Sequence, residues 1–125
     1  MLRVISTDKA PAAVGPYSQA IAAGGFLFVS GQIPLNPLTG ELATEFEAAC
    51  KQSLENLIQL VIAGGSRPEN IVKINIYIRD MSKFPVLNEI YSTYFDHHKP
   101  ARAVVEVSNL PKNALVEMEA VALIP

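Results

Sequence analysis

The sequence predicts an α+β fold in which two helices pack on one face of a single mixed β-sheet. The chain has 125 residues, which suits a single domain over residues 1–125. The spacing of its apolar residues changes along the chain between alternation and three- or four-residue steps. The resulting order is β-β-β-α-β-α-β-β, and placing both helices on one sheet face is the simplest packing for that order.

Composition argues against several functional classes. Half of the residues are hydrophobic and 18% are charged, as in globular proteins with a core. The formal net charge is -2 and no Lys/Arg run forms a basic patch, so nucleic-acid binding is not expected. One cysteine, Cys50, and no visible signal peptide favour the cytoplasm. No apolar run approaches the ~18 residues that a membrane span needs, so no membrane association is expected.

The N-terminal third is predicted to be strands and loops. Strands are expected over residues 2–6, 17–23 and 26–30. Proline and glycine make residues 10–16 and 31–40 loops. Gly24-Gly25 supplies the positive φ angles of a tight hairpin between the second and third strands.

Two helices and three further strands follow. The first helix runs from Phe46 to at least Val61, with an apolar stripe that Gly64-Gly65 ends. The second is expected near residues 83–98, with Asp80 or Ser82 as its N-cap. The remaining strands are predicted over residues 71–78, 103–107 and 115–124, with a turn at 109–113.

This arrangement leaves one sheet face without a helix. The apolar residues expected on that face include Val116, Met118, Ala120 and Ala122. Since no third helix remains to cover them, we expect a partner subunit there.

Arg102, near the start of a strand, is the strongest candidate site residue. Its planar guanidinium matches a carboxylate bidentately. The alternative is a structural ion pair with Glu106, Glu117 or Glu119. Glu117 and Glu119 lie two apart on one strand and therefore share a face, where they could orient water or carry protons, or form a solvated or ion-paired surface.

A hairpin between the last two strands would relate Arg102 to Glu117. With its turn near Pro111-Lys112, Arg102 would pair near Val121, and Glu117 near Glu106. Arg102 and Glu117 would then lie about four residues apart along the ladder, or ~13 Å. That separation is too long for an ion pair. It leaves room for a small ligand and a water, or for a site that another subunit completes.

Other candidates are weaker when taken alone. The Gly31 backbone can approach a ligand closely, although a structural turn is the alternative. Tyr17 could stack on a planar ligand or simply pack, and Asn88 could bind or lie on the surface. Ser30 lacks the local setting of a nucleophile. The sequence shows no metal motif and no cofactor fingerprint.

Several segments, taken in order, resemble the RidA/YjgF family of reactive-intermediate deaminases nearly end to end. They are APAAVGPYSQA (10–20), VSGQIP (29–34), QSLEN (52–56), FPVLNEIY (84–91), PAR (100–102), LPK (110–112) and VEMEA (116–120). The resemblance implies a chorismate-mutase-like (YjgF-like) fold and a homotrimer with clefts between subunits. It also implies hydrolysis of 2-imino acids, such as 2-iminopropanoate and 2-iminobutanoate, to 2-oxo acids and ammonia without a metal or cofactor.

The resemblance also implies roles for residues. The position of Arg102 binds the substrate carboxylate, and that of Glu117 positions the water. The residues whose positions line the pocket are Tyr17, Ser30, Gly31, Asn88 and Val104. Many members have Ser and Cys where this chain has Ala103 and Val104, so a thiol there cannot belong to its mechanism.

Two alternative functions stay open. Endoribonuclease or translation-inhibitor activity is associated with the family, although the acidic pI of about 5.6 argues against it. A non-catalytic trimer that binds carboxylates or acts like a chaperone would bind 2-oxo acids without turning over imines.

Overall fold

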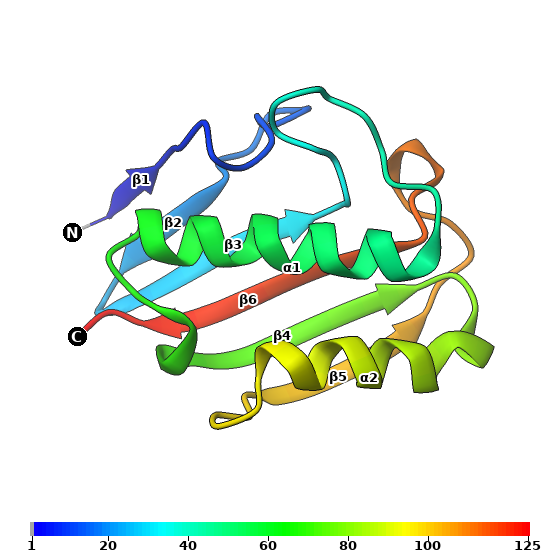
Figure 1. Cartoon of the computed structure of the whole chain (residues 1–125). Coiled ribbons are helices and arrows are strands. Elements are labelled where there is room, and N and C mark those ends of the chain that lie inside the picture. The colour runs from blue at the N-terminus through cyan, green and yellow to red at the C-terminus, as the bar shows by residue number, and fades with distance from the viewer. Residues whose placement is uncertain (1) are drawn as a thin grey trace.

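The computed structural model describes residues 2–125 and contains one six-stranded sheet with both helices on the same face (Figure 1). The strand order is β1-β2-β3-β6-β4-β5. The strands are β1 (Arg3–Ile5), β2 (Ala20–Ala23), β3 (Phe26–Gln32), β4 (Ile71–Ile78), β5 (Ala101–Glu106) and β6 (Val116–Leu123). Among the strands of residues 2–125 only the β4–β5 pair is parallel, so the sheet is mixed and the predicted α+β class is confirmed.

The helices are α1 (Phe46–Ala63) and α2 (Phe84–Tyr94), with short 3-10 turns η1 (Pro68–Asn70), η2 (Met81–Lys83) and η3 (Pro111–Asn113). α1 ends where predicted, because Gly65 adopts a φ of 87° just after it. α2 is shorter than the predicted 83–98. Asp80 caps η2 instead, through a 3.0 Å bond from the Ser82 amide. None of the helices in residues 2–125 is long and apolar enough to cross a membrane.

The N-terminal strands differ from prediction at their ends. Gly24 and Gly25 adopt φ angles of 60° and 81° in the β2–β3 hairpin, as expected. β2 starts at Ala20 rather than residue 17, because the buried Gln19 side chain ties the preceding loop together. Its amide accepts from the Thr7 N–H at 2.9 Å and donates to the Pro11 carbonyl at 2.8 Å.

The predicted hairpin between the last two strands is wrong, because β4 lies between β5 and β6. Arg102 pairs with Ile74 of β4, and Ile74 pairs with Ala120 of β6 on its other side. Glu117 pairs with Tyr77 rather than with Glu106. The cause is the crossover helix α2, which returns the chain to form β5 as a parallel neighbour of β4.

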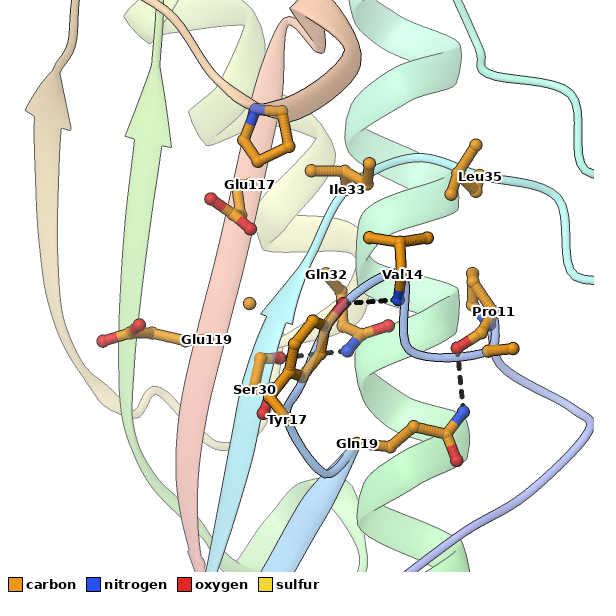
Figure 2. A pocket seen from close by; sticks show the side chains of 13 residues that line it. Pro11, Val14, Tyr17, Gln19, Ser30, Gln32, Ile33, Leu35, Glu117 and Glu119 are labelled. Atoms are coloured by element: carbon orange, nitrogen blue, oxygen red, sulfur yellow. Dashed lines mark hydrogen bonds between the residues drawn. The ribbon is translucent and has the colours of Figure 1, made fainter.

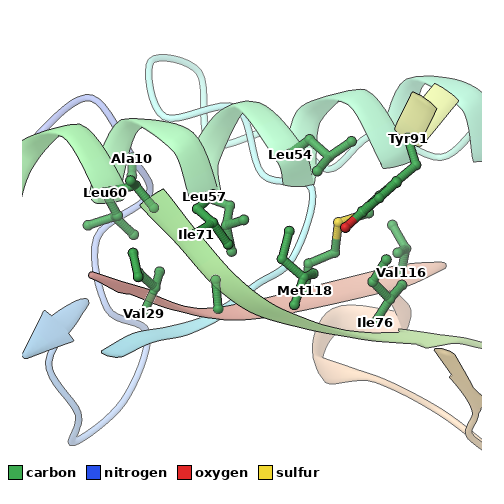
Figure 3. Packing of buried hydrophobic residues seen from close by; sticks show 14 of the residues in the cluster. Ala10, Val29, Leu54, Leu57, Leu60, Ile71, Ile76, Tyr91, Val116 and Met118 are labelled. Atoms are coloured by element: carbon green, nitrogen blue, oxygen red, sulfur yellow. The ribbon is translucent and has the colours of Figure 1, made fainter. Parts of the chain in front are cut away.

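The assignment of β6 to its two sides is also corrected. Val116, Met118 and Ala122 have no exposed surface and Ala120 has 5%, because they face the helices rather than the uncovered side. Leucines of α1 lie over them in the core (Figure 3). The glutamates of β6 therefore belong to the uncovered face. That face also carries apolar residues in the cross-strand row of Val4, Ile21, Phe28 and Val121.

Candidate active site

A cavity of about 380 Å³ opens on the uncovered sheet face near the end of β3 (Figure 2). Four of the predicted site residues line it: Tyr17, Ser30, Gly31 and Glu117. The other lining residues are Pro11, Ala12, Val14, Gln19, Gln32, Ile33, Leu35, Pro111 and Glu119. The cavity therefore joins an apolar wall, mostly from loops, to a polar wall from β3 and β6.

A bulge in β3 shapes the polar wall. Val29 pairs with Ala120 and Gln32 pairs with Met118, so β3 has one more residue than β6 between these pairs. The extra residue falls at Ser30 and Gly31, which the sequence placed at a strand end and in a loop. Such bulges re-aim side chains and are common beside functional sites.

Ser30 joins the end of β3 to the loop that carries Tyr17. Its hydroxyl donates to the Ser18 carbonyl at 2.6 Å, and its amide donates to the Gln19 carbonyl at 3.0 Å. The Tyr17 hydroxyl accepts a 3.3 Å bond from the Val14 amide. Ser30 and Tyr17 thus hold the cavity rim, and the Ser30 hydroxyl proton is already engaged.

Gly31 lies directly against the carboxylate of Glu117. A Cβ atom at residue 31 would stand 2.5 Å from Glu117 Oε2 and 2.8 Å from its Cδ. Those separations are far inside van der Waals contact. Only glycine therefore leaves the Glu117 carboxylate in its present position.

Glu117 and Glu119 project from β6 to the same side (Figure 2) but have different environments. Burial raises the pKa of Glu117, and the neighbouring Glu119 carboxylate raises it further. Glu119 Oε2 instead accepts hydrogen bonds from Asn75 Nδ2 at 3.1 Å and from the Tyr77 hydroxyl at 3.2 Å. Glu119 is a fixed acceptor, whereas Glu117 is suited to carry a proton.

The other predicted site residues lie across the sheet. The Arg102 guanidinium carbon is 4.8 Å from the Tyr91 ring centroid and 5.6 Å from that of Phe84. In the described part of the chain Arg102 forms no ion pair, so the structural alternative with Glu106, Glu117 or Glu119 is wrong. Val104 lies two residues along β5, on the same side.

Asn88 lies on α2 between the two rings. The spacing of Phe84, Asn88 and Tyr91 is four and then three residues, which places them on one helix face. Asn88 is half-buried and shares this helix face with the two rings that lie over the Arg102 guanidinium.

One chain does not bring its predicted site residues together. Arg102 pairs with Ile74, whose buried side chain faces the helices. Glu117 pairs with Tyr77, which lies on the opposite face. Tyr17, Ser30, Gly31 and Glu117 thus form one half of the candidate site, and Asn88, Arg102 and Val104 form the other.

Sequence reasoning missed the apolar cavity wall and the rings over Arg102. Ile33, Leu35 and Pro111 come together only through long-range packing, so no local pattern marks them. Phe84 and Tyr91 carry a local signal, because both belong to the apolar face of the second helix, but that face gives no sign of the arginine that lies over it.

Other reactive groups do not reach the cavity. Cys50 is buried on α1, and burial, with a smaller effect of Glu47, raises the pKa of its thiol to about 12. A thiol of that pKa is a poor nucleophile near neutral pH. Over residues 2–125, no three His, Cys, Asp or Glu side chains come together as a metal site.

Comparison with known proteins adds relatives over the whole length. The Endoribonuclease L-PSP family model matches residues 7–124. The chain is 41% identical over 126 residues to 2-iminobutanoate/2-iminopropanoate deaminase of Escherichia coli K12, with 98% of each chain covered. It is similar to the crystal structure of the E. coli YjgF gene product, with TM-score 0.94, 40% identity and coverage of 98% and 99%. It is also similar to E. coli TdcF with bound serine, with TM-score 0.93, 40% identity and coverage of 97% and 98%.

Proposed function

This chain belongs to the RidA/YjgF family, described as Endoribonuclease L-PSP, and we propose that it hydrolyses 2-imino acids to 2-oxo acids and ammonia. The observation that carries the proposal is the pairing of two groups in one fold. One is an arginine without a carboxylate partner in residues 2–125, and the other is a half-buried carboxyl group with a raised pKa. A 2-imino acid needs an anion-binding group at one end and a proton carrier at the other.

Hydrolysis of a 2-imino acid needs orientation of substrate and water more than any special catalytic group. The carbon of a protonated imine is already electrophilic, so water can add to it without a metal or a covalent enzyme intermediate. Water forms a C–O bond, the C–N bond breaks, and C=NH₂⁺ plus H₂O becomes C=O plus NH₄⁺. Holding substrate and water in register can supply ~7–11 kcal/mol of the barrier at best.

Arg102 and Glu117 divide the work. The Arg102 guanidinium binds the substrate carboxylate with two parallel hydrogen bonds. Glu117 accepts a proton from the attacking water and returns one to the departing nitrogen. The Gly31 amide or the backbone at Val104 fixes the imine end, and Tyr17, Ser30 and Asn88 line the pocket. The serine bound to TdcF is an α-amino acid, close in shape to a 2-imino acid, which supports a ligand of this class.

We further propose that the two halves meet between subunits of a homotrimer. Arg102 and Glu117 lie on opposite faces of one sheet, so one substrate cannot bridge them within a chain. The uncovered face exposes 48% of Phe28 and 47% of Val105, which supports contact with another subunit. Glu117 would then act beside the Arg102 of a neighbouring copy.

The proposed activity is tested by adding the protein to a threonine or serine dehydratase reaction and following imine decay and ammonia release. We expect imine to disappear faster than in water, with stoichiometric 2-oxo acid. Tight binding of 2-oxobutanoate with no acceleration would contradict the enzyme and favour a non-catalytic carboxylate-binding trimer. Rescue of a client protein from aggregation, with neither binding nor turnover, would favour the chaperone-like alternative.

The shared site makes a prediction about mixed trimers. Arg102→Ala and Glu117→Gln subunits should each have little activity alone but regain activity after they are unfolded together and refolded. With random assembly of equal amounts, about a quarter of the clefts combine an intact Glu117 half with an intact Arg102 half. The measurement is ammonia release against the mixing ratio, with each variant refolded alone as the control. If mixing restores nothing although mixed trimers form, the two halves do not meet between subunits.

Gly31→Ala is expected to lower turnover while leaving the fold intact. The new methyl group would lie 2.5 Å from the present position of Glu117 Oε2 and would displace the carboxylate, and a misplacement of about 1 Å can reduce a rate by about 10²-fold. The test compares the kcat of Gly31→Ala with that of Gly40→Ala, where the added Cβ meets no atom within 4 Å. Because Gly40 has a φ of 75°, alanine there should lower the thermal midpoint but leave kcat unchanged. Unchanged kcat in Gly31→Ala would show that the position of Glu117 is not critical.

Endoribonuclease activity remains the second candidate, because the family description names it. The cavity argues against it, since Glu117 and Glu119 place two carboxylates where an RNA phosphate would have to bind. RNA cleavage that survives repeated repurification and disappears in Glu117→Gln would revive this candidate.

A further inference from the structure

We propose that Phe84 and Tyr91 of α2 are positioning residues that hold the Arg102 guanidinium by their ring faces and leave its N–H groups free for an anion. The proposal rests on the proposed role of Arg102 as the carboxylate clamp. It assigns a function to an aromatic pair that would otherwise count only as core packing.

The geometry places the cation against both rings. The Arg102 guanidinium carbon lies 4.8 Å from the Tyr91 centroid and 5.6 Å from the Phe84 centroid, within the range of cation–π attraction. Tyr91 is itself braced, since its ring lies 4.7 Å from that of Phe95 at an interplanar angle of 38°. The rings of Phe84 and Tyr91 therefore form a packed surface on α2 that supports the Arg102 side chain, which starts from edge strand β5.

A ring is a different kind of partner from a carboxylate. It attracts the guanidinium through its face, whereas a carboxylate occupies the in-plane fork of N–H donors. Within residues 2–125, no hydrogen bond and no ion pair engages the Arg102 guanidinium. The pair thus orders a flexible cation without neutralising it, and a side chain ordered in advance loses less entropy when the ligand binds.

The Tyr91 hydroxyl points to the same conclusion. Tyr91 is only 7% exposed and extends into the buried cluster (Figure 3), yet its hydroxyl oxygen has no hydrogen-bond partner among the described residues. Its polar atom therefore contributes no bond that would explain the residue. The aromatic ring of Tyr91, and not its hydroxyl, supports Arg102, so phenylalanine at residue 91 should hold the guanidinium as well as tyrosine does.

The experiment measures binding of 2-oxobutanoate by calorimetry, which does not depend on turnover. Phe84→Leu and Tyr91→Leu should each weaken the Kd by about 3- to 10-fold. Tyr91→Phe should stay within about twofold of the wild-type value because it keeps the ring. The matched control is Tyr94→Leu, which removes a ring from α2 that does not lie over Arg102. Imine kinetics should show the same loss mainly in KM, with kcat at saturation changed less.

A second measurement, by NMR, tests whether the Phe84 and Tyr91 rings lie over Arg102 in the ligand-free protein. Ring currents should move the Arg102 Hδ and Nε–H proton resonances upfield, and Phe84→Leu should move them back toward ordinary arginine values. If Tyr91→Leu fails to fold, the half-buried Phe84 carries both tests. Wild-type Kd and unmoved resonances in Phe84→Leu would overturn the proposal. If no imine is turned over but the ring variants change the 2-oxobutanoate Kd as expected, the deaminase proposal is refuted and the positioning role of Phe84 and Tyr91 is not.

Discussion

Arg102→Ala is expected to lower kcat/KM for 2-iminopropanoate by roughly 10²–10⁴-fold, mainly through weaker binding. The substitution removes two charge-assisted hydrogen bonds to the substrate carboxylate, each worth about 1.5–3 kcal/mol. A factor of ten in binding corresponds to about 1.4 kcal/mol. Imine decay in the coupled assay measures the loss in kcat/KM, and calorimetry with 2-oxobutanoate measures the loss in binding affinity.

Two controls separate the fork of Arg102 from its charge and from the overall charge of the chain. Arg102→Lys keeps the charge but loses the planar fork, so it should recover only part of the activity. Arg67→Ala removes an exposed arginine just before η1 and should behave like the wild type. If Arg102→Ala retains full kcat/KM, the carboxylate is held elsewhere and the proposed mechanism fails.

Glu117→Gln should lower kcat by about 10²–10⁴-fold while sparing 2-oxo acid binding, because a proton carrier contributes about that much to a rate. The amide keeps the size of the carboxylate beside Gly31 but cannot exchange protons. The variant should also be slightly more stable near neutral pH. Since burial and Glu119 raise the pKa of Glu117, its ionised form is the one that the fold disfavours. Single-turnover kinetics and thermal unfolding check the two statements.

The pH profile adds a signature that a structural role would not produce. Glu117 must be ionised to take a proton from water, so kcat/KM should fall as pH drops through its raised pKa. Glu119→Gln removes the neighbouring negative charge, which lowers the pKa of Glu117 and should move this acid limb to lower pH. Glu69→Gln, on the exposed η1 turn, is the matched control. An acid limb that stays in place in Glu119→Gln would contradict the coupling.

The elements that the sequence predicts well are those set by neighbours in the chain. Gly24-Gly25 and Gly65 need positive φ angles wherever the fold places them, and the α1 stripe follows from a local period. The pairing of β6 could not be read in this way. Its partner depends on α2 carrying β5 to the far side of β4, which is a long-range event.

The candidate site also has parts that local sequence predicts and parts that depend on long-range packing. Residue type and spacing made Arg102 and Glu117 candidates, and the alternation of β6 placed Glu117 and Glu119 on one face. The resemblance to the family added the roles of Arg102 and Glu117. Which face the helices cover was predicted wrongly, because alternation alone does not say which side of a strand meets α1. The contact of Gly31 with Glu117 depends on a bulge, which leaves no periodic signal.

The burial of Cys50 has a consequence for stress resistance. Oxidants and alkylating agents attack exposed thiolates, but the only cysteine of this chain is buried, with a thiol pKa of about 12. Residue 104 is a valine, and no cysteine lines the candidate site. Peroxide and electrophilic metabolites therefore have no thiol to modify there. If the proposed function holds, imine hydrolysis by this chain should survive peroxide or alkylating treatment that inactivates thiol-dependent enzymes.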